Sequence, residues 1–176
     1  MYGASLGGLD PAGWKCSADG EIKNGEPQCK DGEDEADFKH SQSLEEGDVW
    51  KMKVVAGGSA QVGIAGEGYD VERPEETCHS TAEVDLYDGT TEISSDISED
   101  GEEHFHSGHL EDHIPKTLPY DLALRIIKDG NMPQLRFNED GEWHDFAPAT
   151  ATLKAGPWFP FCILQEFDGL RDHRVY

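Results

Sequence analysis

The residues best suited to chemistry lie in the stretch SDISEDGEEHFHSGHLEDHIP, between positions 95 and 115. Its four histidines, His104, His106, His109 and His113, sit beside several carboxylates. Neutral imidazoles next to carboxylates suit Zn²⁺, Cu²⁺ or Ni²⁺. In an extended chain His104 and His106 share one face, whereas in a helix His109 and His113 lie four apart and could grip one ion. These four histidines are therefore candidate metal ligands.

The same segment has a plainer interpretation. Only Phe105 and Leu110 offer apolar side chains for burial, and Gly101 and Gly108 interrupt both periodic patterns. Ordered metal sites need supporting partners on rigid elements. We therefore expect residues 95–115 to form a mobile surface loop with at most weak affinity for transition metals. Its histidines should keep their protons to a higher pH than usual, because carboxylates surround them.

Signals for catalysis are scarce elsewhere in the chain. No G-x-S-x-G elbow occurs, and no glycine-rich loop ends in Lys-Ser or Lys-Thr. Carboxylates are so frequent that no pair stands out as acid and base. The acidic run CKDGEDEAD (29–37) lacks the spacing of an EF-hand and is typical of solvated charge. We expect a protein that is not an enzyme and needs no cofactor.

The net charge of the chain limits the kinds of partner that it can bind. The chain of 176 residues carries 37 Asp and Glu against 14 Lys and Arg, a net charge of −23. Such a chain repels phosphate backbones, so we expect no nucleic-acid partner. The charge would favour a basic protein or peptide, or Ca²⁺, although it equally suits solubility or salty surroundings. Whether the chain is a subunit of a larger assembly is left open.

The apolar residues place the chain away from membranes. No run of about 18 apolar residues exists, so no membrane partner is expected. The first residues, MYGASLGGLDPAGWKC, lack the basic start and apolar stretch of a secretory signal, which predicts a cytoplasmic protein. The length suits one domain with a single core.

Four cysteines occur, at Cys16, Cys29, Cys78 and Cys162, and none forms a CxxC pair, which argues against a zinc finger. Cys162, within FPFCIL, is expected to be a buried thiol. Cys16 and Cys29 flank a loop, and a disulfide there would stabilise the fold by about 3 kcal/mol. A reducing cytosol would keep both as thiols, so either state remains open.

From residue 49 onward the apolar residues alternate with polar ones, as strands do. Trp50, Met52 and Val54 share one face. Two paired-strand units are predicted, at 49–70 around a Gly-Gly-Ser turn and at 120–146 around a Lys-Asp-Gly corner. Further strands are expected at 80–90, with a closing Asp-Gly turn, at 157–164, which is apolar enough for burial on both faces, and at the final HRVY. This predicts an all-β, antiparallel β-sandwich or jelly roll.

Residues 1–45 have no such period, and we expect an irregular N-terminal arm packed on a domain formed by residues 46–176. The arm would be anchored by Leu6, Leu9, Trp14 and Phe38.

Three segments of the domain resemble SPRY/B30.2 domains. DVWKMKVVAGGSAQVGIA is similar to the paired-strand signature of that family, LALRIIKDGNMPQLRFNEDGEWHDF to its later hairpin, and LKAGPWFPFCIL to its closing strand. The resemblance covers residues 46–176 in the family's order. It implies a SPRY-like β-sandwich acting as a non-catalytic interaction module, which binds a protein or peptide through loops at one end. The candidate loops are 66–79, 88–119 and 138–149, and the candidate ligand-binding residues are Tyr69, Arg73, Trp143 and His144.

Two alternatives remain from other classes. A carbohydrate-binding or glycan-cleaving jelly roll would use aromatic side chains for sugar stacking, with Tyr87, Trp143 and Trp158 as candidates. Trp158 alternates with core residues, which favours packing. The other alternative is a metal-binding protein that uses the histidines between His104 and His113.

Overall fold

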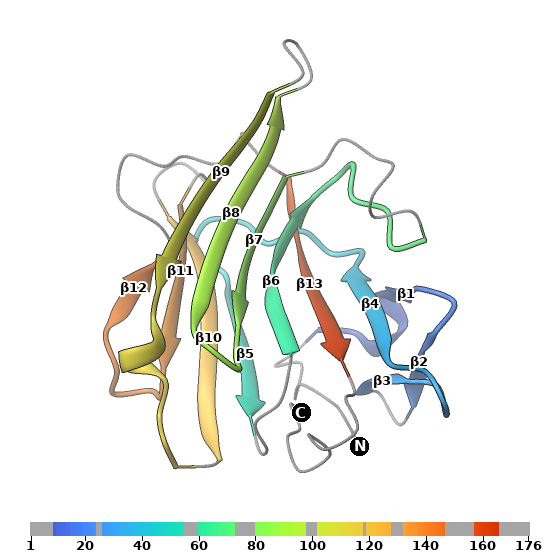
Figure 1. Ribbon diagram of the computed structural model, residues 1–176, viewed down its shortest axis with the longest axis horizontal. Coiled ribbons are helices and arrows are strands. Elements are labelled where there is room, and N and C mark those ends of the chain that lie inside the picture. Colours follow the sequence, from blue (N-terminus) through green and yellow to red (C-terminus); the bar gives the residue numbers. More distant parts are fainter. Residues whose placement is uncertain are drawn as a thin grey trace.

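The computed structural model describes residues 9–23, 26–54, 60–72, 80–97, 102–117, 119–127, 132–146 and 157–165. They form a seven-stranded antiparallel sheet, a four-stranded antiparallel sheet and a separate two-stranded hairpin (Figure 1). The predicted all-β sandwich is therefore confirmed. No helix in this part of the chain is long and apolar enough to cross a membrane.

The strands of the seven-stranded sheet are, in spatial order, β1 (Trp14–Cys16), β4 (Glu35–His40), β13 (Trp158–Gln165), β6 (Ala60–Gly66), β7 (Ser80–Asp85), β8 (Thr90–Ile97) and β9 (Glu102–His109). Those of the four-stranded sheet are β12 (Trp143–Asp145), β11 (Met132–Phe137), β10 (Tyr120–Ile127) and β5 (Val49–Val54). The small hairpin is β2 (Gly20–Lys23) and β3 (Glu26–Cys29), and two 3-10 turns are η1 (Pro11–Gly13) and η2 (Glu111–His113).

The main core contains buried side chains from both sheets, and the alternation of each strand decides which side chains enter it. Trp50, Met52 and Val54 of β5 are buried, while their neighbours in the strand are exposed, as the alternation predicted. From the other sheet, Val62 and Val84 lie in the same core.

β13 lies between β4 and β6 (Figure 1). One of its faces is buried, whereas on the other Phe161 is buried and Phe159 and Ile163 are half-buried, so the predicted burial on both faces is confirmed only in part. Cys162 points into the main core as a buried thiol. Phe161 points to the opposite face, where it joins a second, smaller cluster with Ala65, Tyr69 and Val71.

The strands at 49–54 and 60–66 do not pair with each other, so that prediction is wrong. β5 pairs with β10 in one sheet, whereas β6 pairs with β13 and β7 in the other. β5 and β6 each bury an apolar face in the same core. Their alternation of apolar and polar residues is therefore the same as that of two strands paired in a hairpin. The pairing predicted within 120–146 is confirmed, since β10 pairs with β11. The Gly-Gly-Ser turn, the Lys-Asp-Gly corner and the HRVY strand lie outside the described residues.

Two segments expected to be irregular contain strands. Within the expected arm, β1 and β4 belong to the seven-stranded sheet, and β4 pairs with β13 over five residue pairs. Trp14 and Phe38 are buried, as expected for anchors.

Within 88–119, β8 and β9 form a long hairpin. These polar strands are stabilised by the hydrogen bonds between them and by pairing with β7. The spacing of apolar residues in the sequence does not report either effect. The division of the chain at residue 45 stays a prediction.

Cys16 and Cys29 are not bridged. The Cys16 thiol donates to the carbonyl oxygen of Gly20 at 3.3 Å, and the Cys29 thiol donates to that of Leu164 at 3.6 Å.

Candidate functional site

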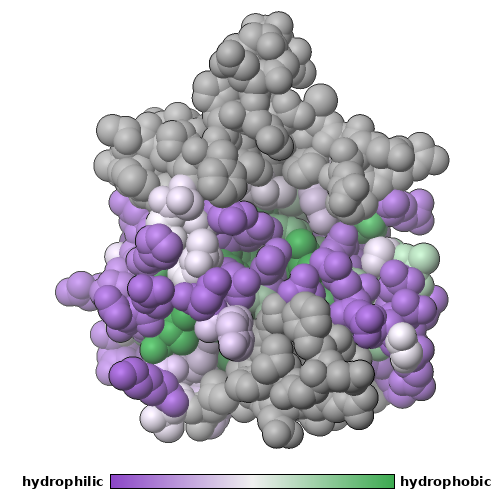
Figure 2. All heavy atoms as spheres, viewed as in Figure 1, coloured by the Kyte–Doolittle hydropathy of each residue, from purple (hydrophilic) through white to green (hydrophobic). Residues whose placement is uncertain are grey.

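The outer face of the seven-stranded sheet, turned away from the four-stranded sheet, carries the most unusual group of side chains. Directly opposed residues of antiparallel strands point to the same face. One row across this face consists of Lys15, Lys39, Phe161, Gly63, Glu83, Glu92 and Ser107. Figure 2 shows this face, which is mainly hydrophilic with small hydrophobic areas between the polar residues.

Glu83 on β7 and Glu92 on β8 are directly opposed in this row. Both are half-buried, and their carboxyl groups are hydrogen-bonded to each other. Burial first, and then the neighbouring carboxyl of Glu92, raise the pKa of Glu83 to about 7. Like charges directly opposed on a sheet are destabilising, so this pair costs the fold stability unless a proton or a cation lies between the two groups.

A second carboxyl group on this face is bonded to a tyrosine. Tyr69 packs its ring on Phe161, with centroids 5.4 Å apart, and its hydroxyl donates to Asp37. Burial, and then the charge of Glu35, raise the pKa of Asp37 to about 6, although the bond from Tyr69 works in the opposite direction. Burial and the Asp37 charge likewise raise the pKa of Tyr69. The face therefore holds several acidic groups in a partly desolvated setting.

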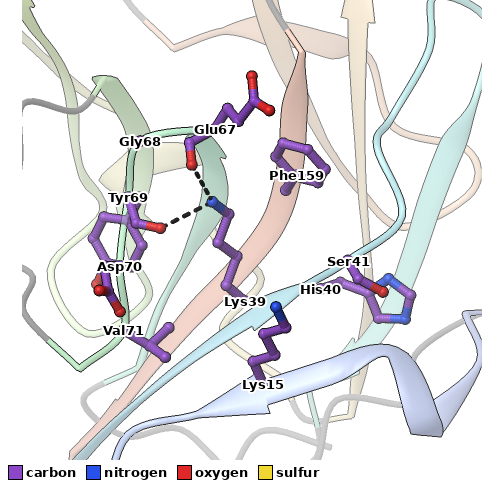
Figure 3. Close-up of a pocket in the computed structure, with 10 residues that line it drawn as sticks. All are labelled: Lys15, Lys39, His40, Ser41, Glu67, Gly68, Tyr69, Asp70, Val71 and Phe159. Carbon is purple, nitrogen blue, oxygen red and sulfur yellow. Dashed lines mark hydrogen bonds between the residues drawn. The ribbon is translucent and has the colours of Figure 1, made fainter.

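The loop that carries Tyr69, residues 66–72, is fastened to the sheet by Lys39 (Figure 3). The Lys39 ammonium donates to the carbonyl oxygens of Gly66, Glu67 and Tyr69 at 2.9, 3.1 and 2.9 Å. These bonds use all three of its hydrogens, so Lys39 has none left for a ligand. Burial lowers the pKa of Lys39, since desolvation disfavours the charged form.

Two cavities flank Val71 of this loop. The first, of about 550 Å³, is bounded by Lys15, Ser41, Asp70 and the ring of Phe159 (Figure 3). The second, of about 460 Å³, is bounded mainly by acidic side chains: Asp19, Glu35, Asp37 and Glu72. The first cavity thus offers an aromatic wall with mixed charges, and the second offers carboxylates.

The structure does not bring the predicted ligand-binding residues together. Tyr69 is buried on the outer face of the seven-stranded sheet, with 6% of its surface exposed, and Arg73 lies outside the described residues. Trp143 and His144 lie on β12, at an edge of the other sheet (Figure 1). The His144 ring stacks on His113 at 4.0 Å, and burial together with His113 lowers the pKa of His144.

The candidate metal ligands are also only partly described. His104 and His106 belong to β9, and their side chains lie outside the described part of the structure. His109 ends β9, while His113 lies in η2 and contacts His144. Among the described residues, no three His, Cys, Asp or Glu side chains are placed to hold one metal ion. The metal site therefore stays a prediction.

Sequence reasoning missed the opposed pair Glu83 and Glu92. The Asp88-Gly89 turn, in which Gly89 has a positive φ of 77°, indicates the hairpin that joins β7 to β8 but not its register. Counting outward from Asp88 and Gly89 would place Glu83 opposite Ser94, whereas the register is centred between Tyr87 and Asp88 and places Glu83 opposite Glu92. Of the aromatic candidates for sugar stacking, Trp158 is buried and Tyr87 is exposed.

Comparison with known proteins finds similarity in structure alone. No family model and no curated protein sequence matches the chain. Carbohydrate-binding module CBM66 from Bacillus subtilis is 11% identical, with 92% of this chain and 90% of that chain covered and a TM-score of 0.49. The VIP36 exoplasmic/lumenal domain, in a Ca²⁺/Man3GlcNAc-bound form, is also 11% identical, with 98% and 83% covered and a TM-score of 0.49. The Bacteroides ovatus mixed-linkage glucan PUL GH16 in complex with G4G4G3G product is 10% identical, with 94% and 76% covered and a TM-score of 0.45. Similarity at this level carries no argument about function.

Proposed function

We propose that this protein is a non-catalytic binding module that takes a basic peptide segment on the outer face of its seven-stranded sheet. The observation that carries the proposal is the directly opposed, hydrogen-bonded pair Glu83 and Glu92. Folding alone gains nothing from two carboxyl groups at this position, and perturbed acidic groups of this kind gather at functional sites.

A cationic side chain is the ligand that this pair fits best. Below neutral pH one proton holds the pair together, and it is lost as the pH rises through about 7, the raised pKa of Glu83. A guanidinium or ammonium group bound there would replace that proton and relieve the repulsion between the carboxylates. Asp37 and Asp85 are half-buried on the same face and would extend the attraction to further basic residues. The net charge of −23 would speed the encounter with such a partner.

The geometry of this pair argues against glycoside hydrolysis. Glycosidases hold their two carboxyl groups apart, by about 5 Å or by about 6.5–9.5 Å, so that each performs its own task. The carboxyl groups of Glu83 and Glu92 are hydrogen-bonded to each other and act as one unit. The nearby Asp85 and Asp88 accept backbone N–H groups of Tyr87 and Thr90, at 2.9 and 2.8 Å, and serve the turn.

This proposal extends the resemblance to SPRY/B30.2 domains, which implies peptide binding through loops at one end of the sandwich. Here the 66–72 loop would form one border of the peptide site, because it lies beside Asp37 and packs on the same sheet face.

The test is a selection from a random peptide display library at pH 8, followed by calorimetry on the enriched peptides. Lys and Arg should be enriched, and the double variant Glu83→Gln with Glu92→Gln should bind at least about tenfold more weakly, as expected for loss of a charge-assisted pair. Glu111→Gln, an exposed carboxylate in η2, is the matched control and should bind normally. Enrichment of neutral or acidic peptides, or equal affinity in the double variant, would refute the proposal.

Carbohydrate binding is the second candidate, and the first cavity favours it. Its volume of about 550 Å³ falls within the range of small-ligand sites, and the Phe159 ring forms an apolar wall among polar groups. A glycan array tests this candidate. Binding of one sugar class that is lost in Phe159→Ala and kept in Glu92→Gln would support it, whereas an array without signal would leave peptide binding as the better proposal.

A further inference from the structure

The outer face of the four-stranded sheet carries an unusual cross-strand row of its own. Lys51 of β5 is opposed to Ala123 of β10, Ala123 to Arg136 of β11, and Arg136 to Trp143 of β12. These four side chains therefore point to one face, on the side of the sandwich away from Glu83 and Glu92. The small alanine leaves a depression between two cations.

Trp143 holds two guanidinium groups in place. The central carbons of Arg125 and Arg136 lie 4.1 and 4.7 Å from the centre of its ring, which is within cation–π distance. Arg125 is fixed further by two hydrogen bonds to the side-chain oxygen of Gln134, at 3.0 and 2.9 Å. Gln134 in turn donates to Asp145 at 2.7 Å. The cations are thus positioned before any ligand arrives.

These arginines lack the partners that a strongly acidic chain could easily supply. Within the described residues neither forms an ion pair with a carboxylate, although the chain has 37 acidic residues. The Nε atom of Arg136 is buried and has no hydrogen-bond partner among them. Lys51 has a single, long contact of 3.9 Å with Glu139, and both side chains are largely exposed. Such a pair contributes little stability and can open at little cost.

A small cavity lies at this row, bounded by Lys51, Asp121, Ala123, Arg136 and Glu139. Its volume of about 60 Å³ is several times the roughly 10–15 Å³ that one water needs on the same measure. We propose that this cavity binds a tetrahedral oxyanion, a phosphate or sulfate group, between Lys51 and Arg136. Arg125 and Trp143 hold the site in shape, and the exposed Glu139 swings away when the anion enters.

The size of the cavity favours a free oxyanion or a monoester over a larger acidic polymer. Asp121 also borders the site, and it lies opposite Lys53, which offsets its charge. The strands place four cations on this face, Lys51, Lys53, Arg125 and Arg136, against the two strand carboxylates Asp121 and Asp145, and Lys51 contacts Glu139, so this row is more basic than the chain as a whole. This site is independent of the proposed peptide-binding function.

The experiment titrates the whole protein with inorganic phosphate, inorganic sulfate and glucose 6-phosphate, each at constant ionic strength, and follows the Arg136 Nε–H and Trp143 indole N–H resonances. All three should shift both resonances with saturation. Stronger binding of glucose 6-phosphate would identify a monoester as the ligand, and equal binding would identify the free anion. Chloride at the same ionic strength should leave both resonances in place.

Variants separate the site from general charge effects. Lys51→Gln should weaken binding severalfold, and Glu139→Gln should tighten it by about two- to fivefold, since it removes a competing carboxylate. Lys116→Gln, an exposed lysine elsewhere, should change nothing. Thermal melts without ligand establish that each variant is folded. Resonances that shift linearly without saturation, or equal effects of Lys51→Gln and Lys116→Gln, would overturn the proposal.

Discussion

Replacing Glu83 by glutamine should stabilise the protein at alkaline pH and have almost no effect at acidic pH. The pKa of Glu83 rises from an ordinary value of 4.5 to about 7 in the folded state, because of burial and of Glu92. The folded protein therefore keeps a proton that the unfolded chain loses. This contribution to stability is fully present below about pH 4.5, and it is lost as the pH rises toward 7.

The size of the effect follows from the shift. Each pKa unit corresponds to about 1.4 kcal/mol, so the rise in the pKa of Glu83 sets an upper limit of roughly 3 kcal/mol. Because Glu83 and Glu92 titrate together on a partly open face, we expect about 2 kcal/mol. Glutamine has nearly the same shape, and its amide can donate to Glu92 as the protonated acid does. Glu83→Gln should therefore gain about 2 kcal/mol at pH 8 and nearly nothing at pH 4.5.

Urea unfolding of both proteins between pH 4.5 and pH 8 measures this difference. Asp37, with a pKa of about 6, and the general repulsion of the acidic chain give both proteins a further loss of stability with pH. The difference between the two curves cancels these shared effects. A loss of stability at pH 8, or a difference that is the same at both ends of the range, would show that the opposed carboxyl groups are not strained.

Three further predictions concern the core, the 66–72 loop and the charge. Trp50→Ala should lower the free energy of unfolding by about 3–5 kcal/mol, because the side chain is 1% exposed; a urea midpoint that hardly moves would contradict its burial. Lys39→Met removes three hydrogen bonds to the 66–72 loop and should make limited proteolysis there faster, with unchanged cleavage as the contrary outcome. In gel-shift assays at physiological salt the protein should retain neither DNA nor RNA, and tight binding would refute the argument from its net charge of −23.

The sequence predicted the sandwich because its core strands alternate strictly. Trp50, Met52 and Val54 show this alternation, and the β10–β11 pairing followed from two such runs close together in the chain. Alternation reports which face of a strand is buried and says nothing about its partner. The alternation therefore could not predict that β5 and β6 belong to different sheets.

The candidate site was less predictable than the fold, because it depends on register across strands that are distant in sequence. Lys39 reaches the carbonyl groups of the 66–72 loop only because β4 pairs with β13, which comes from a late part of the chain. The strands β8 and β9 contain few apolar residues, so their spacing predicts a loop instead of a hairpin. The same dependence on register holds for the pair Glu83 and Glu92, since the Asp88-Gly89 turn indicates the β7–β8 hairpin but not the register that opposes them.

The position of β13 also governs how the chain can fold. Its neighbours β4 and β6 are both synthesised long before it, yet they meet only through β13. Until that strand arrives, each of them presents an open edge on which another chain can pair, and contacts this far apart in sequence form slowly. Insertion of β13 closes two edges in one step. We therefore expect a chain in which β13 has not yet paired to be the form of this protein most prone to aggregation.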